Sequence, residues 1–106
     1  MAEWLTLIDA GEIGPGDREV FDVNGYYVAL FNVDGTYYAI EDACTHDDGP
    51  LAEGELHGHE IECPRHGACF DLRTGEALNP PAVTPAHRFE VRVQDGAVQI
   101  LFDLEG

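Results

Sequence analysis

Short apolar runs rich in Val, Ile, Tyr and Phe alternate along the chain with Gly, Asn and Asp signals about every ten residues, a spacing typical of an all-β domain. No segment carries a clear helical pattern. The runs predict strands over residues 4–8, 19–23, 26–32, 36–40, 60–63, 69–72, 87–93 and 97–102. The first of these is expected at the edge of a sheet.

Three dipeptides predict tight hairpin turns between strands: Asn24-Gly25, Asp34-Gly35 and Asp95-Gly96. Both positions of such a dipeptide tolerate positive φ, which a two-residue hairpin turn requires. The strands from 19 to 40 should therefore form a meander, and 87–93 should pair with 97–102. In 87–93 the apolar residues Phe89, Val91 and Val93 alternate with charged ones, so their side chains are expected to face the core.

Charge excludes several classes of partner. The 106 residues include 5 Lys plus Arg against 21 Asp plus Glu, a formal net charge of −16, and none of the five cations is a Lys. Binding to nucleic acid or to an anionic membrane surface needs clustered cations. A hydrophobic fraction of 44% nevertheless indicates a globular chain, and its length predicts a single domain over residues 1–106.

No apolar run approaches the roughly 20 residues that span a bilayer, and the N-terminus lacks a basic region followed by a hydrophobic one. The protein is expected to be soluble and cytoplasmic.

The middle of the chain, about residues 42–81, differs from the β-rich flanks. It holds all three cysteines and four of the five histidines, together with several Gly and Pro. Such a loop-rich insert buries little apolar surface. We therefore expect something other than a core to hold its loops in place.

Two pairs of potential metal ligands stand in this insert, Cys44-Thr45-His46 and Cys63-Pro64-Arg65-His66, and residues 47–62 form a spacer of sixteen between them. Two thiolates and two imidazoles make a complete first shell for a metal centre. Zinc is one candidate, although structural zinc sites usually pair ligands of one kind. In a two-iron cluster with two Cys on one iron and two His on the other, each loop would give one ligand to each metal.

The remaining Cys and His residues give weaker signals. Three cysteines fit a disulfide framework poorly, and Cys69 is expected to be a half-buried apolar thiol on a strand. His57 and His59 flank Gly58 in an apparent turn and are expected to be exposed.

The ligand spacing resembles that of the Rieske iron–sulfur proteins, in which C-x-H, a spacer of about 16 to 17 residues and C-x-x-H follow one another. The stretch CPRHGACFDLRTGEAL looks like the second ligand loop of that family, and the resemblance runs from about Trp4 to Phe102. It implies one [2Fe-2S] cluster, with Cys44 and Cys63 on the buried iron and His46 and His66 on the outer one.

The resemblance also implies an architecture. We expect an antiparallel β-sandwich or partly closed barrel with a small cluster-binding subdomain, about residues 42–81, inserted in it. Asn79-Pro80-Pro81 resembles the proline-bearing third loop that covers the cluster in the family.

Departures from the family pattern indicate a branch. Gly49 and Arg65 stand where high-potential members carry cysteines that join the two loops, and Ala68 and Phe70 stand where those members carry Ser and Tyr hydroxyl donors. Lacking these donors, the reduced cluster would be less stabilised. We expect a reduction potential toward the low end of the Rieske range, about −150 mV.

These observations predict an electron carrier rather than an enzyme. The chain has no Gly-rich phosphate loop and no convincing second histidine–carboxylate set for a mononuclear iron. The resemblance implies a ferredoxin that passes electrons from an NAD(P)H-dependent reductase to a terminal oxygenase of the aromatic-ring dioxygenase type. Weak electrostatic docking is expected, with His46 and His66 as the electron port and Asp47, Asp48 and Pro80 around it. Two alternatives remain open: a Rieske-like small subunit of a nitrite reductase or other multi-subunit oxidoreductase, and a structural zinc module.

Overall fold

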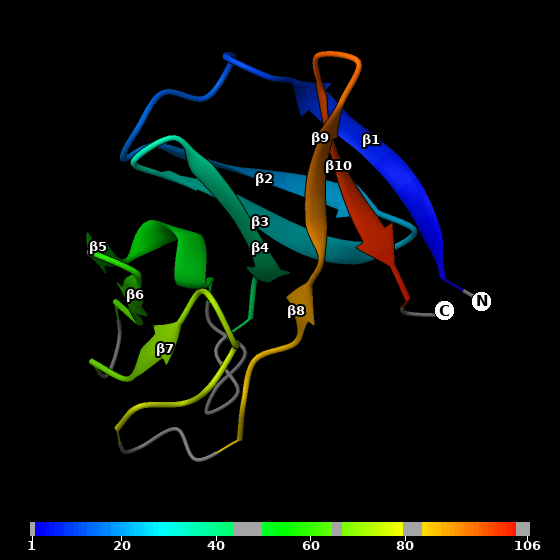
Figure 1. The fold of residues 1–106 in the computed structure, drawn as a ribbon. Helices are drawn as coiled ribbons and strands as arrows, with labels where there is room; N and C mark the ends of the chain where they lie inside the picture. The colour runs from blue at the N-terminus through cyan, green and yellow to red at the C-terminus, as the bar shows by residue number, and fades with distance from the viewer. Residues whose placement is uncertain (1, 44–49, 65–66, 80–83, 104–106) are drawn as a thin grey trace.

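The computed structural model describes residues 2–43, 50–64, 67–79 and 84–103. Within these residues the strands form three antiparallel sheets (Figure 1). The first sheet has the order β1 (Glu3–Asp9), β10 (Ala97–Phe102), β9 (Val91–Gln94). The second sheet has the order β2 (Arg18–Val23), β3 (Tyr26–Val33), β4 (Thr36–Glu41), β8 (Arg88–Phe89). The small sheet consists of β5 (Glu55–His57), β6 (Glu60–Glu62) and β7 (Cys69–Asp71), and the 3₁₀ turn η1 (Leu51–Glu53) precedes it. The predicted all-β class is confirmed.

The three hairpin dipeptides form the turns that the sequence predicts. Asn24, Asp34 and Asp95 have φ values of 52°, 53° and 54°, and the glycine after each also has positive φ. Consecutive residues with positive φ give the twist that joins antiparallel strands without splaying them. The meander β2-β3-β4 and the hairpin β9-β10 follow, and β1 lies at a sheet edge as expected.

Strand β3 lies between two hydrophobic clusters. Val28 and Leu30 pack with residues of the first sheet, whereas Ala29 and Phe31 pack with η1 and the small sheet. The first sheet thus covers one face of the second sheet, and the small sheet and η1 cover part of the other (Figure 1). This packing fixes the small sheet on the sandwich.

The strand predicted over 87–93 is divided at Glu90. Phe89 pairs with Ala39 of the second sheet, whereas the residues from Val91 onward pair with β10 of the first. The predicted burial of Val93 is wrong, because 53% of its surface is exposed. Val93 lies one residue before the end of β9, close to the Asp95-Gly96 turn. The short strand β5 and the turn η1 are additional elements that the apolar pattern did not predict.

The turn that follows β7 is organised by Asp71. Its carboxylate accepts hydrogen bonds from the backbone N–H of Arg73 at 2.8 Å and from the Arg73 guanidinium at 3.1 Å, and its own carbonyl accepts from the Gly75 N–H. The side-chain bonds from Arg73 lower the pKa of the Asp71 carboxyl below its ordinary value of 3.8, against the opposing effect of burial. The ionised carboxylate therefore stabilises the folded chain.

We expect Asp71→Asn to lower the free energy of unfolding at pH 7 by about 1 to 3 kcal/mol, the range for hydrogen bonds to a charged group. Because the folded pKa lies below the unfolded one, this stabilisation is complete well above pH 4 and is lost as the pH falls through the folded pKa. Urea unfolding at pH 7 and pH 3 measures it, with the exposed Glu76→Gln of the same turn as the charge-matched control. If Asp71→Asn lowers the free energy of unfolding by the same amount at both pH values, the assigned direction of the Asp71 pKa shift is contradicted.

Candidate metal centre

The structure describes one of the four predicted ligands. Cys63 lies directly after β6 and has no exposed surface. Cys44, His46 and His66 lie outside the described residues, as do Asp47, Asp48 and Pro80. The centre is therefore analysed from Cys63 and from the segments that flank the other ligands.

Backbone hydrogen bonds close the second ligand loop tightly. The N–H of Cys63 donates to the Ala68 carbonyl at 2.6 Å, and the N–H of Gly67 donates to the Cys63 carbonyl at 3.0 Å. Gly67 has a φ of 74°, a conformation that L side chains rarely adopt. Cys63, Gly67 and Ala68 thus close the base of the connection between β6 and β7.

The two ends of the first ligand loop are joined by Asp42. Its Oδ1 accepts a hydrogen bond from the N–H of Ala52 at 2.7 Å, which links the residues before the loop to those after it. Burial raises the pKa of the Asp42 carboxyl, and the backbone bonds from Ala52 and Leu51 oppose that effect. Leu51, directly after Pro50, is fully buried. The loop between these ends is thereby anchored on both sides.

The flanks of the two ligand loops meet at Gly54. A Cβ on Gly54 would fall on the carbonyl oxygen of Glu62, the residue before Cys63. Leu51, Cys63 and Ala68 also belong to one hydrophobic cluster. The flanks of the two ligand motifs, which are separated in sequence, are therefore in direct backbone contact and belong to the same hydrophobic cluster.

Asn79 attaches the start of the third loop to the second. Its Oδ1 accepts from the Cys69 N–H at 2.6 Å, and its Nδ2 donates to the Gly67 carbonyl at 3.2 Å. The N–H of Leu78 donates to the Cys69 carbonyl as well. The following residues, Pro80 and Pro81, lie outside the described part of the chain, so the predicted covering role of this loop stays a prediction.

The described residues fit a thiolate-ligated metal group. Cys63 is a buried thiol without a disulfide among the described residues, at the base of a loop whose backbone is fixed on both sides. Ala68 and Phe70, fully buried beside it in the same cluster, bring no hydroxyl group to the loop. A buried thiol in a fixed position is suited to metal ligation, whereas reagents in solution have little access to it.

Cys69 has a different environment, as the sequence predicts. It is half-buried on β7, and its thiol donates to the Gly67 carbonyl at 3.6 Å. Burial, then the charges of Glu62 and Glu60, raise the pKa of the Cys69 thiol. This environment disfavours the thiolate form that ligates metals.

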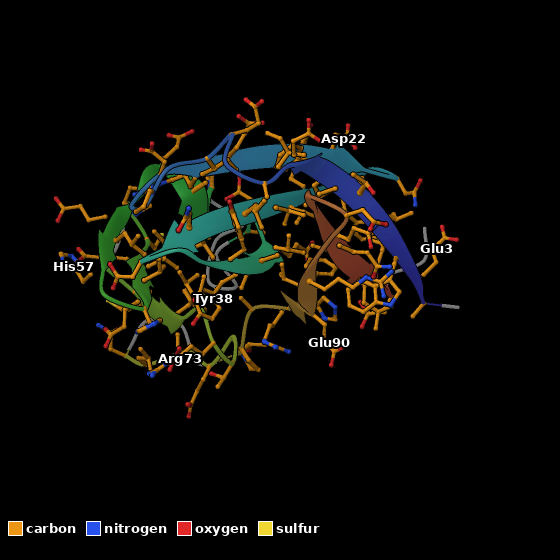
Figure 2. The ribbon with its side chains drawn as sticks, turned by 45° about the horizontal axis from the view of Figure 1, so that its top comes forward. Glu3, Asp22, Tyr38, His57, Arg73 and Glu90 are labelled. Atoms are coloured by element: carbon orange, nitrogen blue, oxygen red, sulfur yellow. The ribbon has the colours of Figure 1, made fainter. Side chains whose placement is uncertain are left out.

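His57 and His59 lie around the Gly58 turn of the small sheet. His57 is exposed, with Nε2 at 3.2 Å from Glu62 Oε1 and 3.4 Å from Glu55 Oε2, and its side chain points away from the molecule (Figure 2). His59 contacts the Tyr38 ring edge-on. Among the described residues no group of three or more His, Cys, Asp or Glu could hold a metal ion.

Comparison with known proteins identifies the family. The model of the Rieske [2Fe-2S] domain matches residues 3–98. The chain belongs to the Rieske [2Fe-2S] domain family. The cofactor of this Rieske domain is accordingly a [2Fe-2S] cluster, as the ligand spacing predicted. When bound, such a cluster accepts and releases one electron at a time.

Relatives of this Rieske chain are ferredoxins. It is 40% identical to Ferredoxin CarAc of Metapseudomonas resinovorans, over 92% of each chain. It is 33% identical to the ferredoxin component of the naphthalene 1,2-dioxygenase system of Pseudomonas putida, over 96% of each chain. One chain of the solved complex of reduced oxygenase and oxidized ferredoxin in carbazole 1,9a-dioxygenase superposes with a TM-score of 0.88 and 37% identity, covering 96% of this chain and 97% of that one. The expected Rieske fold is confirmed. Among the described residues, no helix is long and apolar enough to cross a membrane.

Three residues that position the ligand loops of the Rieske chain escaped the sequence analysis: Arg18, Asp42 and Gly54. A glycine between short strands signals a close backbone approach, so the role of Gly54 has a local sequence signal. Arg18 donates hydrogen bonds to Ala52 and Gly54, which lie 34 and 36 positions further along the chain. No local pattern reports such a contact.

We expect Gly54→Ala to lower the free energy of unfolding by about 1 to 3 kcal/mol or more, because the added methyl group must displace backbone rather than a flexible side chain. It should also reduce the cluster content measured by visible absorption per mole of chain. Gly14→Ala is the matched control, since a Cβ there meets an atom of Asp17 at the ordinary contact distance of 3.5 Å. Equal stability and colour in the two variants would disprove the contact between the loops.

Proposed function

We propose that this protein is a one-electron carrier that delivers electrons to a terminal oxygenase of the aromatic-ring dioxygenase type. The observation that carries the proposal is the buried Cys63 thiol on a hairpin that packs against the flank of the first ligand loop. The ferredoxin relatives and the solved ferredoxin–oxygenase complex support it. A carrier, rather than a catalyst, is proposed because the cluster and a docking surface are all that such transfer requires.

In this proposal Cys44, His46, Cys63 and His66 ligate the cluster, the two cysteines on one iron and the two histidines on the other. The 1–106 chain would act as a single domain, with residues 42–81 as its cluster-binding subdomain. The anchoring of Asp42 to Ala52 and of Asn79 to Gly67 and Cys69 supports this role for the insert. The protein residues hold the loops and exclude water from Cys63.

A low reduction potential is part of the proposal. Ala68 and Phe70 are buried beside Cys63 and offer no hydroxyl hydrogen bond to stabilise added negative charge. The acidic surface supports the same conclusion, since Glu3, Asp22 and Glu90 point outward from different parts of the molecule (Figure 2). A negative surrounding disfavours an extra electron.

We also propose the partners and the location. An NAD(P)H-dependent ferredoxin reductase would supply the electrons, in the cytoplasm where such dinucleotides are held. Docking would be weak and electrostatically guided, because a carrier must leave after each transfer.

Replacement of the proposed ligands tests the cluster assignment. Cys44→Ser or Cys63→Ser should abolish the visible absorption of the purified protein, and His46→Ala or His66→Ala should remove it or shorten its lifetime, because solvent does not replace a buried thiolate. Cys69→Ser is the control and should keep the colour. A colourless wild-type protein that contains zinc would refute the carrier proposal, and bleaching by Cys69→Ser but not Cys63→Ser would refute the ligand assignment.

Salt dependence tests the docking. The rate of electron transfer to the oxygenase should fall steeply between about 0.01 and 0.5 M salt, as the Debye length shrinks from about 30 Å to a few Å. Asp47→Asn with Asp48→Asn should flatten the dependence and leave the spectrum unchanged. The control pair, Asp9→Asn with Asp95→Asn, removes the same charge at the far end of the first sheet, and Asn tolerates the positive φ of Asp95. A rate that does not depend on salt would favour a domain fixed in a larger reductase.

A further inference from the structure

Arg18, the first residue of β2, reaches the segment between the two ligand loops. Its Nη1 donates hydrogen bonds to the carbonyl oxygens of Ala52 at 3.1 Å and of Gly54 at 2.6 Å. The guanidinium carbon lies 5.7 Å from the centroid of the Phe31 ring, which is fully buried. One cationic side chain thus joins the second sheet to the end of η1.

The carbonyls that Arg18 binds are those that a 3₁₀ turn leaves without internal partners at its end. Hydrogen bonds from a charged donor to such groups are stronger than neutral ones. The half-buried site also shields these bonds from competing water. The contact is therefore expected to hold η1 in place more firmly than its three residues would do alone.

Three connections meet in this segment. The N–H of Ala52 is bonded to Asp42, at the start of the first ligand loop. Gly54 packs on the backbone of Glu62, next to Cys63 of the second loop. Arg18 binds the carbonyls of the same two residues, Ala52 and Gly54. Movement of η1 would therefore displace both loops relative to each other.

We propose that Arg18 is a positioning residue for the cluster: it fixes the spacing between the two ligand loops and places a positive charge on the cluster side of the second sheet. The inference rests on the proposed function for the ligand assignment. A firm spacing slows loss of the cluster, and the nearby cation favours the reduced state, which carries one more negative charge. The chain has five Arg and no Lys against 21 Asp and Glu, so the loss of one cation removes a fifth of its fixed positive charge.

Arg92 provides a matched control. Its guanidinium carbon lies 4.1 Å from the centroid of the Trp4 ring, and its Nε donates to Gln99. It thus combines a cation–π contact and a hydrogen bond as Arg18 does, but both partners, Trp4 and Gln99, belong to the first sheet. Arg92→Met removes the same charge and the same kind of aromatic contact.

The experiment compares wild type, Arg18→Met, Arg18→Lys and Arg92→Met, each as the cluster-loaded full chain. Three quantities are measured: the rate of bleaching under an iron chelator, the reduction potential, and the hydrogen exchange of the Ala52 and Gly54 amides. Met keeps the apolar length of the side chain, so that packing on Phe31 is retained. Lys keeps the charge and can donate to either carbonyl.

In Arg18→Met we expect bleaching and exchange of the two amides to be at least about tenfold faster, because both charged hydrogen bonds are lost and one alone accounts for about that factor. The potential should fall below that of Arg92→Met. Arg18→Lys should recover part of both effects, and Arg92→Met should match wild type in bleaching and in amide exchange.

Equal bleaching in Arg18→Met and Arg92→Met, or equal potentials in the two, would overturn the proposal, as would unchanged exchange at Ala52 and Gly54. If Arg18→Met does not fold, Arg18→Lys decides, because it keeps the charge but not the two-pronged guanidinium contact. A native potential with bleaching and amide exchange faster than in Arg92→Met supports the proposal, and bleaching and exchange equal to those of Arg92→Met overturn it. A wild-type chain without a cluster would refute the proposed function. The amide exchange of Ala52 and Gly54 reports on the Arg18 contact whether or not the chain holds a cluster, so the two failures can be distinguished.

Discussion

The fold depends on the burial of β3 on both of its faces. Its residues from Val28 to Val33 are all buried, and they alternate between the cluster shared with the first sheet and the cluster shared with the small sheet. A single strand therefore joins two cores. The polar Asn32 in this strand is tolerated because its side chain donates to the Ile13 carbonyl and accepts from the Gly35 N–H, so that no buried polar group is left unpaired.

The small sheet buries Ile61 and Phe70 completely in the cluster around Phe31, so the expectation that the insert buries little apolar surface is wrong. The insert also depends on contacts at specific atoms: Gly54 against the Glu62 carbonyl, Asp42 to Ala52, and Asn79 to the second loop. These contacts all lie where the ligand loops begin or end. The flanks of the ligand loops are thus held by burial together with hydrogen bonds and close backbone contact, and only the latter two are directional enough to set exact positions.

Sequence patterns predicted the features of the fold that depend on residues adjacent in the chain. The Asn24-Gly25, Asp34-Gly35 and Asp95-Gly96 turns need only two residues with positive φ, and these dipeptides predicted the turns correctly. The ligand spacing is also a local motif, and it identified the family. The division at Glu90, the exposure of Val93 and the reach of Arg18 depend on which strand or loop lies opposite. Those neighbours are distant in sequence, so alternation within one segment carries no information about them. Three of the four predicted ligands, Cys44, His46 and His66, rest on the motif alone.

Three of the cations among the described residues make specific contacts, whereas Arg88 is exposed. Arg18 binds carbonyls of η1, Arg73 binds Asp71, and Arg92 lies over Trp4. The far field of the molecule is therefore left to the carboxylates, whereas the local field near η1 includes a cation. At separations large compared with the spacing of the surface charges, the net negative charge dominates the approach of a partner, and salt weakens that interaction beyond about 10 Å. In the proposal for Arg18, its placement affects the energy of the added electron at short range. Attraction of a partner would then be controlled by the carboxylates, and the reduction potential of the cluster by Arg18.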